Sequence, residues 1–147
     1  MHTTATDVQP QPLTRELRPV WVVSAAASAV ALVVTELYGL AARLAGVPMA
    51  AAGFGQAKAG PVNAGSFAMG VVICAFWGTV LAVVLARFAR RPARVYLITT
   101  IALTAVSLFA PLSAADTATS TKLTLAVGHI LAAAVIIPPV TRRLTRR

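Results

Sequence analysis

Two ionisable side chains, Glu36 and His129, interrupt long apolar stretches and are the residues of this sequence best suited to chemistry. A charge inside a membrane-spanning helix is costly, so each is by default a candidate functional residue. A rise of ~1.5 Å per residue places both in the outer half of a bilayer, at a depth comparable to that of Ser107 and Cys74. These four residues make up the candidate buried polar site.

Three hypotheses account for Glu36 and His129. A contact between them would offset the cost of burying both groups and would couple their protonation. That contact could serve proton-linked transport, or it could hold the first and last spans together. Alternatively, Glu36 reaches the outer surface and meets Arg43 or Lys58. The sequence favours the structural contact and leaves the others open.

Catalytic and metal chemistry have little support in this sequence. Intramembrane hydrolysis would require a nucleophile within reach of a base, and Ser107 or Cys74 with His129 could supply them only nominally. No neighbouring pattern marks either residue as activated. Glu36, His129 and Cys74 also offer too few ligands for a metal site. We therefore expect no catalytic residue, no cofactor and no metal, and hence no enzyme.

The elements that must position these residues are membrane helices. Hydrophobic residues make up 58% of the chain and charged residues 12%, against about 45–50% and 25% in soluble domains. Four apolar stretches approach the roughly 20 residues needed to cross a bilayer. They predict an all-α integral membrane protein, a four-transmembrane-helix bundle within a 20–141 domain. The predicted spans are about 20–42, 67–86, 95–115 and 123–140.

The segments outside the spans are polar, basic or irregular. Residues 1–19 lack a hydrophobic period and predict a disordered cytoplasmic tail, and 142–147 form a basic cytoplasmic tail. The connection 46–66 is rich in Gly, Ala and Pro, and it could lie along the interface or form a small external cap. A cleaved signal peptide is the alternative to the first span, but the apolar pattern continues past Glu36 and favours a retained span.

The basic residues predict the orientation of the spans. With the N-terminus inside, ten of the thirteen basic residues face the cytoplasm, and Arg43, Lys58 and Lys122 face outward. This bias predicts an N-in/C-in topology. The inner clusters could also bind anionic lipids, whereas their position beside spans argues against nucleic acid as a partner. The inner residues are Arg15, Arg18, Arg87, Arg90, Arg91, Arg94, Arg142, Arg143, Arg146 and Arg147.

Small residues at four-residue spacing predict how the spans pack. Between helices in lipid, close backbone approach through small residues favours association. The second span carries the stripe that we expect to pack most tightly, and a similar stripe lies in the first span. The first-span residues are Ala27, Ala31, Thr35 and Gly39. The second-span residues are Gly70, Cys74, Gly78 and Ala82, continuing to Ala86.

Prolines and hydroxyl groups predict local features of the last two spans. Pro111 leaves the carbonyl of Ser107 without its helical donor, so we expect a kink there. Thr100, Thr104 and Ser107 share a face; we expect their hydroxyls to bond to carbonyls of the preceding turn, although they could instead line a polar pathway. Pro138 and Pro139 predict the end of the fourth span.

One part of the chain resembles a known family. The stretch from Leu108 through Pro111 and Leu112, with Leu125 to Pro138 around His129, resembles an uncharacterised family of small actinobacterial membrane proteins, described only as a domain of unknown function. The resemblance implies a multi-pass, four-span protein of the bacterial cell (inner) membrane, with a polar external connection after the first span. It implies no activity. Members need not have an acid at the Glu36 position, which argues against an obligate Glu36–His129 device.

Two functions follow as expectations. The small-residue stripes and the lack of catalytic groups favour a structural or accessory membrane protein, which self-associates or binds a membrane partner protein. The alternative is a small proton-coupled transporter that uses Glu36 and His129, because residues 35–39 are superficially similar to a segment of small multidrug transporters. The other spans lack the aromatic-rich pattern of that family, and the first connection is too long for it.

Overall fold

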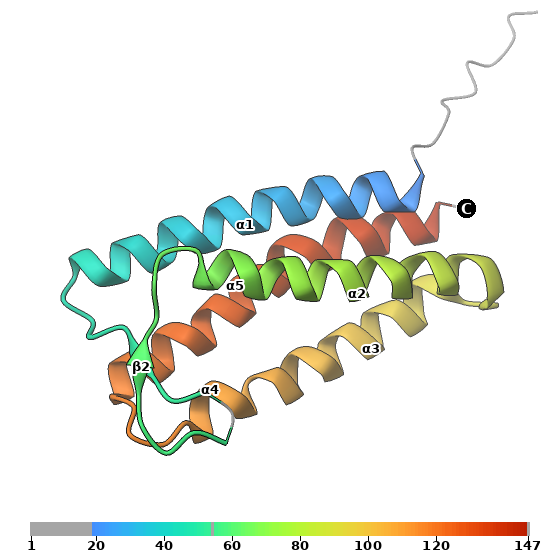
Figure 1. Ribbon diagram of the computed structural model, residues 1–147. Coiled ribbons are helices and arrows are strands. Elements are labelled where there is room, and N and C mark those ends of the chain that lie inside the picture. The colour runs from blue at the N-terminus through green and yellow to red at the C-terminus, as the bar shows by residue number, and fades with distance from the viewer. Residues whose placement is uncertain (1–18, 54, 147) are drawn as a thin grey trace, which may run out of the picture.

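Four long apolar helical spans lie side by side in the computed structural model, which describes residues 19–53 and 55–146 (Figure 1). The third span is divided in two. The helices are α1 (Val20–Leu44), α2 (Ser66–Phe88), α3 (Pro92–Ser107), α4 (Phe109–Ser113) and α5 (Thr119–Thr145). The prediction of an all-α, four-span membrane protein is confirmed. The predicted disordered tail lies outside the described residues, apart from Pro19.

The surface of the bundle matches a lipid environment. Large apolar side chains such as Val33, Phe76 and Ile101 are more than half exposed. Helices satisfy their own backbone hydrogen bonds, as the bilayer core requires, so apolar side chains can face lipid without cost. Many of the buried residues are small, such as Ala31, Thr35 and Ala82, while Tyr96 is the largest fully buried side chain.

The buried face of α1 is the small-residue stripe expected from the sequence. Its inner residues contact α5 and α2, the two helices against which α1 packs. One hydrogen bond between hydroxyls, Ser24 Oγ to Thr79 Oγ1 at 2.7 Å, joins α1 to α2. The buried residues of α1 are Val20, Ser24, Ala27, Ala31, Thr35 and Gly39.

A buried apolar cluster joins the spans near the α2–α3 connection. Its members come from all four spans: Val20, Ala82, Ala86, Tyr96, Val140 and Leu144. The prediction that the fourth span ends at Pro138 and Pro139 is wrong, because α5 continues to Thr145. The two prolines remove two backbone donors, but Val140 is 0% and Leu144 2% exposed. Packing in the cluster therefore holds the last turns of α5 in helical form.

The third span is interrupted where the sequence predicts a kink. The helix α3 ends at Ser107, and the short helix α4 begins at Phe109, in the turn that precedes Pro111. Proline has no N–H to bond the Ser107 carbonyl, which accounts for the break.

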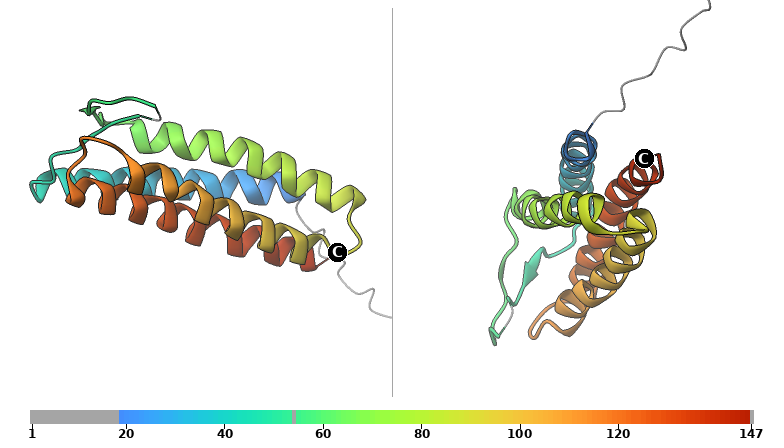
Figure 2. Two further views of the ribbon diagram at one scale, coloured as in Figure 1. Left: turned by 90° about the horizontal axis from the view of Figure 1, so that it is seen from below. Right: turned by 90° about the vertical axis from the view of Figure 1, so that its right-hand side faces the viewer.

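The connection after α1 folds into a small cap over one end of the bundle. Two short antiparallel strands, β1 (Ala50–Ala51) and β2 (Gly60–Pro61), hold it together. The Ala52 N–H donates to Thr117 Oγ1 at 3.0 Å, and the Ala59 N–H donates to Asp116 Oδ2 at 3.2 Å. Figure 2 shows the cap and the α4–α5 connection at the same end. Of the two alternatives for this segment, the structure has the cap.

Candidate functional site

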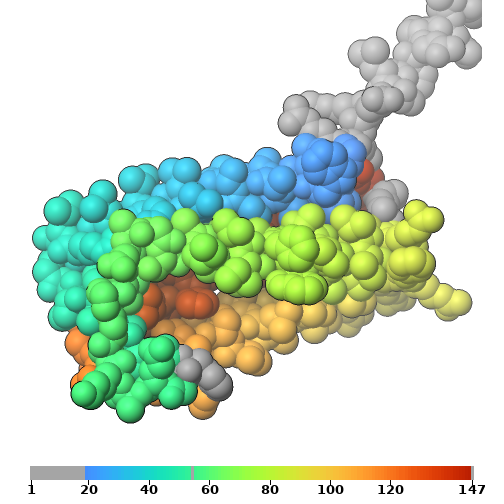
Figure 3. Space-filling view, viewed as in Figure 1, coloured from blue at the N-terminus to red at the C-terminus, as the bar shows by residue number. Residues whose placement is uncertain are grey.

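A groove of about 550 Å³ lies between α2 and α3, with α5 at its floor. The two helices meet in the buried cluster and diverge from there toward the capped end (Figure 1). Figure 3 shows the resulting hollow, in which α5 is visible between α2 and the α3–α4 segment. Its volume falls within the roughly 300–1,000 Å³ of sites that hold drug-sized molecules. We refer to this hollow as the α2–α3 groove.

Most of the predicted packing stripe of α2 lines this groove. Ala82 is fully buried in the apolar cluster, but Cys74 is exposed. A Cβ atom added at Gly70 or Gly78 would meet nothing within 4 Å. Gly70, Cys74 and Gly78 all line the groove, so these small residues give the groove its width.

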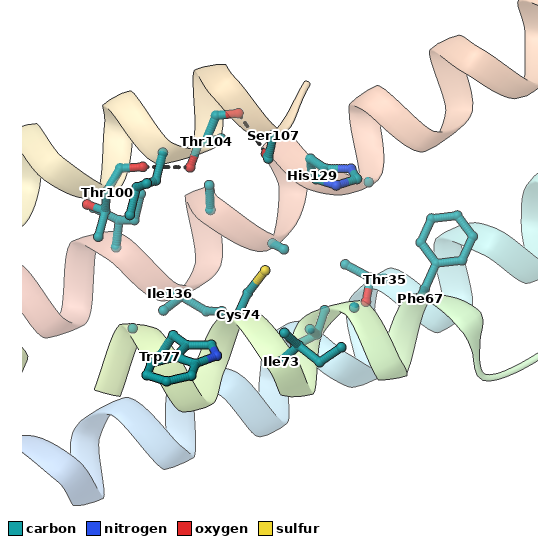
Figure 4. A pocket seen from close by; sticks show the side chains of 18 of the residues that line it. Thr35, Phe67, Ile73, Cys74, Trp77, Thr100, Thr104, Ser107, His129 and Ile136 are labelled. Carbon is teal, nitrogen blue, oxygen red and sulfur yellow. Dashed lines mark hydrogen bonds between the residues drawn. The ribbon is translucent and has the colours of Figure 1, made fainter. Parts of the chain in front are cut away.

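The opposite wall carries hydroxyl groups of α3 (Figure 4). Thr100 donates to the Tyr96 carbonyl at 2.7 Å, Thr104 to the Thr100 carbonyl at 2.8 Å, and Ser107 to the Thr104 carbonyl at 2.7 Å. The predicted back-bonding to the preceding turn is confirmed. The same side chains line the groove, which gives it one weakly polar wall.

His129 of α5 is the one ionisable imidazole at the groove among the described residues. Its Nδ1 lies 2.8 Å from the carbonyl oxygen of Leu125. A carbonyl only accepts, so Nδ1 carries the proton and Nε2 of the neutral ring is an acceptor. No described residue forms a hydrogen bond with Nε2, and Figure 4 shows the ring among the side chains of the groove.

Glu36 lies outside the groove and caps α2. Its Oε1 accepts from the Ala68 N–H at 2.7 Å and its Oε2 from the Gly65 N–H at 3.2 Å. Gly65 precedes the helix with φ of +88° and offers no side chain of its own as a cap. A carboxylate at this position satisfies free N–H groups and interacts favourably with the helix dipole.

The structure therefore brings together three of the four candidate polar residues, namely Ser107, Cys74 and His129. Within the described part of the chain no hydrogen bond or ion pair joins Glu36 to His129; Glu36 bonds the start of α2, and His129 Nδ1 bonds the Leu125 carbonyl. Arg43, one proposed partner of Glu36, donates instead to the Val62 carbonyl of the cap. The cap role of Glu36 was not among the sequence hypotheses.

Sequence reasoning also missed Phe67. A Cβ added at Gly39 of α1 would lie 2.9 Å from the Phe67 ring, and one at Gly128 of α5 would lie 2.7 Å from it. Tyr38 makes an edge-to-face contact with the same ring at a centroid distance of 6.4 Å. The glycines in the two helices were a visible signal, but nothing in the sequence paired them with Phe67.

Comparison with known proteins gives a family but no activity. No curated protein and no solved structure matches the chain. A family model described as a family of unknown function, DUF6069, matches residues 15–146. The match extends over all four spans and the cap between the first two. The chain therefore belongs to the DUF6069 family.

Proposed function

We propose that this protein is a non-enzymatic, structural or accessory component of the bacterial cell membrane whose α2–α3 groove holds an apolar partner drawn from the bilayer. One observation carries the proposal: the groove opens sideways between two membrane-spanning helices, and its lining among residues 19–53 and 55–146 contains no Asp, Glu, Lys or Arg. An apolar molecule or helix can therefore reach it from lipid without crossing water.

The distribution of arginine supports an N-in/C-in orientation. Arg87, Arg90, Arg91 and Arg94 surround the α2–α3 connection, and the C-terminal end of α5 lies at the same end of the bundle (Figure 1). The positive-inside rule places this end in the cytoplasm. Anionic lipid headgroups are then the natural counterions of these arginines, each worth about 1 kcal/mol near a membrane surface.

A proton-coupled transporter has less support. A coupling carboxylate must exchange its proton along the substrate pathway, but Glu36 bonds the start of α2 and does not line the groove. An enzyme also has less support, because the Ser107 hydroxyl donates to the Thr104 carbonyl and has no base bonded to it.

Tryptophan fluorescence can test whether the groove has an occupant. The chain has two tryptophans, and both are exposed. Trp77 is 65% exposed and lines the groove, whereas Trp21 is 57% exposed on α1 and is not among the lining residues. In phosphatidylcholine nanodiscs of a Trp21→Phe variant, we expect 1-bromoundecane, a quenching apolar probe, to quench Trp77 with a saturable component in addition to the gradual quenching from lipid. In the matched Trp77→Phe variant, Trp21 should show only the gradual quenching that follows partition into lipid.

The second part of this test is a substitution that fills the groove. Gly78→Leu would add a branched side chain whose Cβ atom meets nothing within 4 Å, and Gly78 lines the groove, so we expect it to abolish saturable quenching while the protein stays folded. Equal, unsaturable quenching of both tryptophans would overturn the proposal. Loss of an oligomer in Gly78→Leu, with no saturable quenching in the parent, would show instead that the groove binds a second copy of the chain.

A further inference from the structure

We infer that the occupant of the α2–α3 groove is a neutral apolar molecule with a hydroxyl group, and that this hydroxyl donates a hydrogen bond to Nε2 of His129. The inference rests on the proposed function, since it names the chemistry of the groove's occupant. Long-chain alcohols, prenyl alcohols and diacylglycerols share this chemistry.

The first argument is that Nε2 of His129 is a hydrogen-bond acceptor without a donor. The Leu125 carbonyl accepts from Nδ1 of His129, so in the neutral form of the ring Nε2 is the acceptor. Nε2 is not among the fully buried, unbonded atoms of the described residues, and none of these residues bonds it. Nε2 therefore keeps accessible surface, and His129 lines the groove. An acceptor that faces apolar surroundings without a partner is unfavourable, so a donor is required there.

The second argument concerns where that donor could come from. The hydroxyls of Thr100, Thr104 and Ser107 already donate within α3, and Thr35 at the back of the groove donates to Ala31 within α1. These groups can accept a hydrogen bond but have no second proton to give. The other donor side chains of the lining, Ser66, Trp77, Tyr96 and Thr99, form no hydrogen bond with His129 within the described part of the chain. A hydroxyl on the occupant supplies the missing proton.

The third argument concerns charge. The lining of the groove contains no carboxylate, ammonium or guanidinium group among the described residues. A cationic or anionic head would therefore lose its hydration without gaining a counterion. Apolar side chains such as Ile73, Leu81 and Ile136 dominate the rest of the lining, which suits an apolar body. A neutral head on an apolar body is the chemistry that fits (Figure 4).

A matched pair of probes tests the hydrogen bond. On the Trp21→Phe protein in phosphatidylcholine nanodiscs, 11-bromo-1-undecanol is compared with its methyl ether, which lacks only the donor. We expect saturable quenching of Trp77 by both, with the alcohol about fivefold to tenfold tighter, the range expected for one hydrogen bond. His129→Phe should reduce the alcohol to the affinity of the ether. Ile130→Phe, at the lipid-facing neighbour that is 52% exposed, should leave the preference intact.

Unbrominated competitors distinguish the sources of the hydroxyl. Displacement of the bromoalcohol by farnesol points to a prenyl alcohol, and displacement by dioctanoylglycerol points to a glycerolipid. Equal affinity of alcohol and ether for the protein with His129 intact would overturn the inference while leaving the proposed function standing. Absence of saturable quenching by either probe would overturn both. Equal affinity of the two probes for intact His129 would overturn the inference even if His129→Phe does not fold.

Discussion

Glu36 shows how an acidic residue in a span can be explained by structure alone. Its carboxylate bonds two N–H groups at the start of α2, where Gly65 provides no side-chain cap. An unsatisfied N–H near the bilayer is expensive, so a carboxylate donated by a neighbouring helix stabilises the bundle. Glu36 is the residue that most suggests proton transport in the sequence. Its bonds to the start of α2 are enough to explain its presence without transport.

We expect Glu36→Ala to destabilise the protein by about 1–2 kcal/mol, the combined effect of a lost cap and a lost dipole interaction. Glu36→Gln keeps an oxygen acceptor but loses the charge, so its loss should be intermediate. Thermal unfolding in detergent measures both. Leu37→Ala, at a position that is 60% exposed, is the control. Wild-type stability of Glu36→Ala would show that the cap is dispensable.

The contact of Phe67 with two glycines leads to a second prediction. Gly128→Ala would place a Cβ 2.7 Å from Cε1 of Phe67, and we expect a loss of about 1–3 kcal/mol from overpacking. Phe67→Leu should relieve most of this loss in the double variant, as a double-mutant cycle would reveal.

Gly70→Ala provides the matched control for that cycle, because its added Cβ would meet nothing within 4 Å. It should be neutral, or stabilising by up to about 1 kcal/mol through helix propensity. Equal losses from Gly70→Ala and Gly128→Ala would contradict the close approach of Phe67 to Gly128.

At the scale of elements, the sequence predicts the spans well and their contacts only in part. Apolar runs of bilayer length identify all four spans, because lipid imposes that length. Residue spacing shows which side chains share a helix face, but not what that face meets. The stripe of α1 is buried, whereas the equally regular stripe of α2 is buried at Ala82 and open at Gly70 and Gly78. The groove arises from the divergence of α2 and α3, which no local pattern encodes.

The same limit applies to the end of α5 and to the site. Pro138 and Pro139 are local signals for a helix end, but burial of Val140 and Leu144 overrides them. From the sequence, Ser107, Cys74 and His129 were predicted to lie at a similar depth in the bilayer, and in the structure all three line the same groove. Glu36 was predicted at the same depth, but its side chain points to the start of α2, and depth alone does not predict that direction.

A third prediction concerns the cap that residues of the α1–α2 connection form. Thr117 Oγ1 accepts from the Ala52 N–H, so Thr117→Val, which keeps the shape but removes the acceptor, should loosen the cap. We expect amide hydrogen exchange of the 50–62 segment to accelerate about fivefold to tenfold, as loss of one hydrogen bond implies. Ser113→Ala removes a hydroxyl that donates only within its own helix, and it should leave this exchange unchanged. Unaltered exchange in Thr117→Val would show that the bond does not hold the cap.

At the scale of the whole molecule, the two ends of the bundle differ in chemistry. One end holds the arginines of the α2–α3 connection and of the last turn of α5. The other holds the cap, with Arg43 bonded to Val62 and Asp116 bonded to Ala59. The first end is suited to a negatively charged membrane surface, and the second to a compact, internally bonded external surface.

The difference between the two ends predicts the orientation in the membrane, and substitutions that change no charged residue can test it. The chain has one cysteine, Cys74, so Cys74→Ala provides a background for single labels. We expect Ala57→Cys in the cap to react with a membrane-impermeant maleimide in intact cells, and Thr145→Cys to react only after permeabilisation. Both positions are exposed. The reverse labelling pattern would overturn the N-in/C-in orientation.

The attachment of α2 at both ends has a mechanical consequence. Glu36 and the Phe67 contacts fix its first turn, while Ala82 and Ala86 fix its last turns in the buried cluster. Between these anchors, Gly70, Cys74 and Gly78 line the groove and leave the helix without close support on that side. On the other side, packing against α1 and the hydrogen bond between Thr79 and Ser24 hold the middle of α2. The width of the groove is therefore set by where α1 and the two anchors hold α2, and not by contacts across the groove.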